Sequence, residues 1–226
     1  MIERVTLTAS DGIALVGDYY APASPAAKGL LLLHMMPATR SSWRAFAERA
    51  QGAGWHVLAI DLRGHGESQG GPDGYRSFSD AEHQASRFDV EAGATFLASK
   101  GVDTLALGGA SIGANLALQY LSDPPAGGPD ARAAFLLSPG LDYRGVKTEP
   151  FARRVRPDQA AYFAASAEDM RSSGQSATDM AGILHGLCPC RKEIKMFENA
   201  GHGTTMFERE PEFMAEILAW LQKVAP

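Results

Sequence analysis

Apolar and polar positions follow two periods along the chain, and the two periods predict different elements. Segments 2–8 and 13–20 flank Ser10-Asp11-Gly12, a sequence that favours a hairpin turn between two strands. Further short runs are almost continuously apolar, as expected of parallel strands covered on both faces. These runs are 29–34, 56–61, 104–109, 133–138, 161–166 and 193–198.

Segments between and after these runs carry helical signals. The predicted helices cover 43–51, 79–99, 111–121, 176–187 and 211–224. Ser79 with Glu82 is a capping-box pattern, and Phe213, Ile217 and Leu221 recur at helical spacing in the last segment. A hairpin followed by repeated strand–helix units predicts an α/β fold with one doubly wound, mostly parallel sheet of about eight strands and helices on both faces.

The composition excludes several classes of protein. The 226 residues are 45% hydrophobic and 21% charged, which is enough apolar material for a single domain over 1–226. The net charge of −5 argues against a nucleic-acid partner, which would usually require a basic face. Neither a signal-peptide pattern nor an apolar run long enough to span a bilayer is present, so we expect a cytoplasmic protein with no membrane partner.

The two cysteines, Cys188 and Cys190, are separated only by Pro189. Two cysteines cannot build a disulfide framework, and no partners at zinc-ligand spacing accompany them. We therefore expect a reduced pair and no metal site.

The most informative segment is 109–113, Gly-Ala-Ser-Ile-Gly, which matches the pattern G-x-S-x-G. A predicted strand runs into it and a predicted helix follows, which is the context that a nucleophile elbow requires. Ser111 is therefore the candidate nucleophile, and the N–H of Ile112 at the helix start is a candidate oxyanion donor. The alternative is a Gly/Ser turn that only starts a helix.

On these residues the chain resembles the α/β-hydrolases, over nearly its whole length. Segment 61–68, Asp-Leu-Arg-Gly-His-Gly-Glu-Ser, also resembles the D-x-R-G-x-G-x-S turn that this family uses structurally. The resemblance implies a carboxylesterase-like serine hydrolase. Only about 20 residues separate Ser138 from Ala161, too few for a separate cap domain, so a short lid-like segment at 139–160 is the most we expect.

The family order of serine, acid and histidine implies the two partners of Ser111. His202, in the Gly-rich loop 199–203, resembles the catalytic histidine, whereas His185 lies among apolar residues of a predicted helix. The acid should follow the strand at 161–166, where Asp169 fits the family spacing better than Glu168. Asp142 is an outside candidate, since some members of the family take the acid from the preceding strand.

Segment 34–37, His-Met-Met-Pro, resembles the family's His-Gly-x loop after the third strand. The match makes the N–H of Met36 the second oxyanion donor beside Ile112. Met35 replaces the usual glycine, so the donor could shift to Met35 and its side chain could crowd the oxyanion hole. His34 is expected to anchor the loop, and the two methionines could either line an acyl pocket or pack in the core.

These residues predict cleavage of carboxylic esters with small or short-to-medium acyl chains, with thioesters as a further substrate class. Ser111, His202 and Asp169 would form the triad, with no cofactor and no metal. A peptidase or amidase on the same triad, or a non-catalytic binding protein, is the alternative. Five cations between Arg144 and Arg156 could favour anionic substrates or form a solvated face. The oligomeric state stays open.

Overall fold

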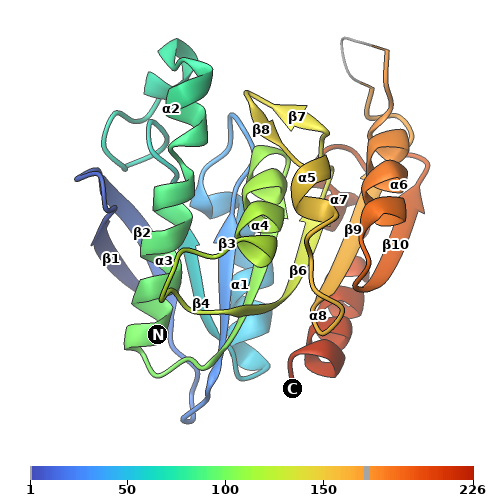
Figure 1. The fold of residues 1–226 in the computed structure, drawn as a ribbon. Coiled ribbons are helices and arrows are strands. Elements are labelled where there is room, and N and C mark those ends of the chain that lie inside the picture. Colours follow the sequence, from blue (N-terminus) through green and yellow to red (C-terminus); the bar gives the residue numbers. More distant parts are fainter. Residues whose placement is uncertain (1, 171–173) are drawn as a thin grey trace.

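The structure is a computed structural model that describes residues 2–170 and 174–226. One eight-stranded sheet runs through the molecule in the order β1-β2-β4-β3-β5-β6-β9-β10 (Figure 1). Its strands are β1 (Ile2–Thr8), β2 (Ala14–Tyr20), β3 (Lys28–Leu33), β4 (His56–Ile60), β5 (Thr104–Ala110), β6 (Ala131–Leu137), β9 (Ala160–Ser166) and β10 (Arg191–Phe197). Strand β2 runs antiparallel to both neighbours, and every other pair is parallel. The predicted α/β architecture is confirmed.

Two apolar cores lie on the two faces of the sheet, because successive side chains of a strand point to opposite faces. In β3, Leu31 and Leu33 pack into one core, while Leu30 and Leu32 pack into the other, and all four are fully buried. Helices α3 (Arg87–Ser99), α4 (Ile112–Ser122) and α6 (Ala177–Leu187) cover the first core. Helices α1 (Arg44–Gly52) and α8 (Phe213–Val224) cover the second.

The predicted helix 79–99 is interrupted in the structure. Helix α2 (Asp80–Gln84) begins with the expected capping box of Ser79 and Glu82, but it ends before α3 begins at Arg87. His83 and Asp89 are both buried, although six residues on one continuous helix would place them about 120° apart. The break therefore lets two polar side chains reach the interior from consecutive helices. The sequence did not predict the break, because no glycine or proline lies at it.

Short elements occupy the connections. A 3-10 turn, η1 (Arg40–Trp43), precedes α1, and a second, η2 (Gly74–Ser77), precedes α2. Segment 139–160 forms a two-stranded ribbon of β7 (Asp142–Tyr143) and β8 (Val146–Lys147), followed by α5 (Glu149–Ala152). Helix α7 (Thr205–Arg209) was not predicted. No helix within 2–170 and 174–226 is long and apolar enough to cross a lipid bilayer.

The segment 61–68 acts as a hydrogen-bonded turn after β4. The Asp61 carboxylate is fully buried and accepts the N–H groups of Arg40 and Glu67, at 2.8 and 2.9 Å. Arg63 donates three hydrogen bonds to the buried Asp89, from its backbone N, Nε and Nη2. The charged groups of Asp61, Arg63 and Asp89 are therefore held in hydrogen bonds within the protein, which agrees with the structural role expected for this turn.

The expectation of a reduced cysteine pair is wrong, because Cys188 and Cys190 form a disulfide. Helix α6 ends at Leu187, and Cys188 is already extended, with φ −74° and ψ 121°. The chain then turns through Pro189 and brings the two Cα atoms to 5.5 Å. That separation lies within the range of about 4.4–6.8 Å that a disulfide requires.

Candidate active site

Ser111 lies between β5 and α4 in a strained turn. Its backbone has φ 55° and ψ −119°, a region that residues with a side chain rarely occupy. A Cβ on Gly109 would lie 2.2 Å from the carbonyl oxygen of Gly113, and one on Gly113 would lie 2.3 Å from that of Leu33. Both flanking positions therefore exclude any side chain, which is the physical reason for the glycines of this motif.

His202 and Asp169 come together from two different loops. Asp169 follows β9, His202 follows β10, and the Oδ2 atom of Asp169 lies 2.6 Å from Nδ1 of His202. The Asp169 side chain is 10% exposed and the His202 side chain 29%, so water screens the pair only in part. The imidazole therefore has one nitrogen held by a carboxylate and its Nε2 left for another partner.

The His202 loop also reaches the strand that carries Ser111. A Cβ on Gly203 would lie 3.2 Å from Cβ of Ala110, the residue before Ser111. Within the described residues no hydrogen bond joins Ser111 to His202, as is common in free enzymes whose catalytic contacts tighten with substrate. Ser111 is 5% exposed, so the hydroxyl lies in a nearly closed environment.

Two serines that the sequence did not single out anchor this loop. Ser138 after β6 accepts the N–H of Gly203 on its Oγ at 3.1 Å. Ser166 at the end of β9 accepts the N–H of Ala200 at 2.9 Å. Both serines are fully buried, and both terminate apolar strands on the same edge of the sheet. A polar residue that ends a buried parallel strand is the signal that could have identified them.

Glu168, the second candidate for the acid, has partners other than His202. Its Oε1 accepts the N–H of Gly201 at 2.8 Å and forms an ion pair with Arg209 of α7. Arg209 also donates to the carbonyl of Asn199, at 3.3 Å. Glu168 thus ties the first part of the His202 loop to the Asp169 loop.

The other two titratable candidates lie away from this cluster. Asp142 is exposed in β7, where its Oδ1 accepts the N–H of Gly145 at 2.7 Å. His185 lies in α6 with its ring 5.9 Å from that of Phe163, and burial lowers its pKa. Neither residue takes part in the Asp169–His202 contact.

His34 determines the direction of the peptide that follows it. Its Nε2 accepts the N–H of Leu62 at 3.0 Å, so its Nδ1 carries the proton and donates to the carbonyl of Met35 at 2.9 Å. In a planar trans peptide the N–H points opposite to the carbonyl, so the N–H of Met36 points away from His34. Complete burial, reinforced by His65, lowers the pKa of His34 to about 3 and keeps the ring neutral.

Met35 causes no backbone strain in the position usually held by glycine. The described residues with a side chain and positive φ are Ser111, Ser138 and Arg144, so Met35 is not among them. Met35 packs against the core beneath α1 and α8, while Met36 packs against the core beneath α3 and α4. A Cβ on Gly203 would lie 2.5 Å from Sδ of Met35, so the thioether fills the space that this glycine leaves.

The comparisons with known proteins agree with this fold. Residues 29–201 match the family model of the alpha/beta hydrolase fold, and the chain belongs to that family. A comparison with curated proteins gives no match by sequence.

Solved structures of similar shape include two esterases and a dienelactone hydrolase. The Pyrococcus furiosus esterase has a TM-score of 0.77 at 15% identity, covering 100% of this chain and 92% of that one. A Rhodococcus esterase has a TM-score of 0.73 at 16% identity, covering 98% and 99%. The Anabaena variabilis dienelactone hydrolase has a TM-score of 0.77 at 17% identity, covering 100% and 99%. Identities this low establish a shared fold and leave the substrate to be argued from the site.

Proposed function

We propose that the protein is a serine hydrolase that cleaves carboxylic esters through an acyl-enzyme. The observation that carries the proposal is the contact of 2.6 Å between Asp169 and His202, on a loop that packs beside the strained Ser111 turn. The esterases among the structures of similar fold support the same class of reaction.

In the proposed mechanism the Oγ of Ser111 attacks the ester carbonyl carbon while Nε2 of His202 accepts the hydroxyl proton. The Asp169 carboxylate holds the Nδ1 proton and stabilises the imidazolium that forms. The N–H groups of Ile112 and Met36 donate to the oxyanion, since Ile112 begins α4 and the Met36 N–H points away from His34.

His202 then returns the proton to the leaving alcohol oxygen as the carbon–oxygen bond breaks, which leaves Ser111 acylated. Water attacks the acyl carbon with His202 again accepting the proton, and the carboxylic acid and free serine are released. We assign the short lid-like role to the β7–β8 ribbon, whose Tyr143 donates to the carbonyl of Ser138 at 3.2 Å.

The proposal is tested with a fluorophosphonate probe and with p-nitrophenyl acetate, butyrate and octanoate. We expect labelling and turnover in the wild type, and loss of both in Ser111→Ala and His202→Ala. Ser122→Ala is the matched control, because this serine lies at the far end of α4 and donates only to the carbonyl of Gln119. A folded wild type with neither labelling nor turnover would contradict the proposal, and faster cleavage of matched amides would indicate an amidase.

A further inference from the structure

Strand β10 forms one edge of the sheet, and within 2–170 and 174–226 no strand pairs with its outer side (Figure 1). The N–H of Arg191 and the carbonyl of Phe197 bond, at 3.2 and 2.8 Å, to the residues just before and just after β9. Backbone groups alternate in direction along a strand, so those of Lys192, Ile194 and Met196 point outward. These groups are available to a further strand.

Exposed large apolar side chains gather beside this edge. Within the described chain Met196 of β10, Ile183 of α6 and Met170 are 43%, 40% and 56% exposed, and the fourth such residue lies on β1. Helix α6 packs against β10. The loop of Met170 begins at the end of β10, because the N–H of Glu168 donates to the carbonyl of Glu198 at 3.2 Å. Such a cluster on an open strand edge is typical of an association surface.

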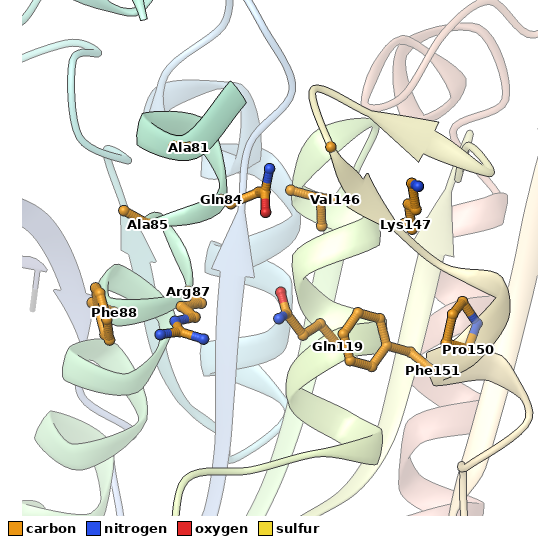
Figure 2. A pocket seen from close by; sticks show the side chains of 11 residues that line it. Ala81, Gln84, Ala85, Arg87, Phe88, Gln119, Val146, Lys147, Pro150 and Phe151 are labelled. Atoms are coloured by element: carbon orange, nitrogen blue, oxygen red, sulfur yellow. The ribbon is translucent and has the colours of Figure 1, made fainter. Parts of the chain in front are cut away.

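The surface between α3 and α4 has a different character. The hollow there lies between the α2–α3 pair, α4 and the segment from β8 to α5 (Figure 2). Its lining includes the polar side chains of Gln84, Arg87, Gln119 and Lys147. The most exposed apolar residues of the described chain are therefore not in this hollow but at the two edges of the sheet, chiefly at β10.

The sequence of β10 is complementary to itself when a second copy runs antiparallel to it. With a two-fold axis at Ile194, this residue meets its own copy as a hydrogen-bonded pair, and Glu193 lies opposite Lys195 of the second copy. Opposite charges in such positions stabilise a strand pair, whereas like charges destabilise it. An axis at Glu193 or at Lys195 would place that charge opposite its own copy. The charges therefore favour the register centred on Ile194, which also uses all seven residues of the strand.

The two lysines of β10 do not block this pairing, although lysines often protect an edge strand. The Nζ atom of Lys192 donates to the carbonyls of His185 and Cys188, at 2.7 Å each. Lys195 forms an ion pair with Glu216 of α8. Their own chain thus holds both ammonium groups toward the helices that flank β10.

We propose that two copies of this chain associate through their β10 strands, which joins the two eight-stranded sheets into one. Lys192, Ile194 and Met196 would each donate and accept a main-chain hydrogen bond across the two-fold axis. An axis perpendicular to the sheet places both α6 helices on the same face, where the exposed apolar residues would be shielded from water. Because Ser111 and His202 take no part, the proposal does not depend on the proposed hydrolytic activity.

The test is sedimentation velocity of the whole protein over a wide range of concentration, where we expect the mass to rise to that of two chains. Glu193→Lys and Lys195→Glu each place like charges opposite each other on both sides of the axis. Each variant should therefore raise the dissociation constant roughly tenfold or more. In an equal mixture of the two variants opposite charges face each other again, so association should return to within about threefold of the wild type.

A matched pair of variants distinguishes the two edges of the sheet. Met196→Lys puts a charge opposite Lys192 of the second copy and should weaken association, whereas Ile2→Lys on β1, at 41% exposure, should not. Thermal melts verify that every variant is folded, which we expect because none of the replaced side chains is buried.

Four results would overturn the proposal. The first is a wild type that stays monomeric at every concentration. The others are a dimer that both charge variants leave intact, a mixture of these variants that does not recover association, and a dimer that Ile2→Lys disrupts. Each of the last three would place the contact away from the β10 register centred on Ile194.

Discussion

Asp169 and Glu168 are neighbours in sequence with separate partners, and replacing each by its amide tests that division. Asp169 contacts Nδ1 of His202, whereas Glu168 contacts the N–H of Gly201 and the guanidinium of Arg209. If the proposed mechanism holds, Asp169→Asn removes the charge that stabilises the imidazolium in the transition state. Glu168→Gln removes only one tie of the loop, and the amide oxygen of glutamine can still accept from Gly201.

The contacts give the expected magnitudes. Charge centres about 4 Å apart interact by about 4 kcal/mol at an effective dielectric constant of about 20, so Asp169→Asn should lower kcat by ~10³-fold. The Glu168–Arg209 pair is weaker, because the two side chains are 36% and 50% exposed. Exposed pairs contribute about 0.2–1 kcal/mol, which limits Glu168→Gln to a loss of about fivefold.

The assay is kcat and KM for p-nitrophenyl butyrate at constant pH, with thermal melts to verify folding. The reasoning would be refuted if Glu168→Gln were as damaging as Asp169→Asn, or if Asp169→Asn kept activity within tenfold of the wild type. An Asp169→Glu variant adds a check on geometry, since it keeps the charge but moves the carboxylate away from its contact of 2.6 Å.

Three further predictions concern stability. Gly113→Ala would put a Cβ 2.3 Å from the carbonyl oxygen of Leu33, so Tm should fall by roughly 5–10 °C. Gly182 of α6 has open space around it, and alanine favours a helix over glycine, so Gly182→Ala should raise Tm by ~2 °C in the same thermal melts. Burial and His65 hold the pKa of His34 at about 3, below its unfolded value of about 6.5. The unfolded chain therefore binds a proton that the native state excludes, and stability should be full above pH 6.5 and decline as pH falls toward 3. The free energy of unfolding, measured with urea at several pH values in this range, should depend less steeply on pH in His34→Gln than in the wild type, by about one proton.

The sheet could be predicted from sequence because its signals are local. Buried parallel strands appear in the sequence as short apolar runs, and the pattern G-x-S-x-G around Ser111 lies within one short segment, where Gly109 leaves room for the carbonyl of Gly113. The capping box of Ser79 was predicted on the same basis and is present.

The predictions that failed depended on the path of the backbone, which the local sequence patterns did not show. The break between α2 and α3 lets Asp89 reach Arg63. The residues of 79–99 contain no sign of this contact, because the buried arginine lies in another segment. The Cys188–Cys190 disulfide depends on how the chain leaves α6, which cysteine counting ignores.

The separation of roles between Glu168 and Asp169 is a contact of the same kind. Both residues follow one strand, and only the path of the chain after β10 decides which carboxylate meets His202 and which meets Gly201. The family spacing favoured Asp169 as the acid, and in the structure Asp169 lies against His202. The same spacing did not predict that Glu168 would contact the N–H of Gly201.

The candidate site is assembled from the ends of strands, which explains how distant residues converge. Parallel strands leave their carboxyl ends at one edge of a sheet, so the residues after β3, β5, β6, β9 and β10 meet there. Met36, Ser111, Ser138, Asp169 and His202 follow these five strands in that order. At the ends of β6 and β9, the buried Ser138 and Ser166 accept hydrogen bonds from backbone N–H groups of the loop that carries His202. The position of His202 is therefore set by rigid strands on both sides, although His202 itself lies in a loop rich in glycine.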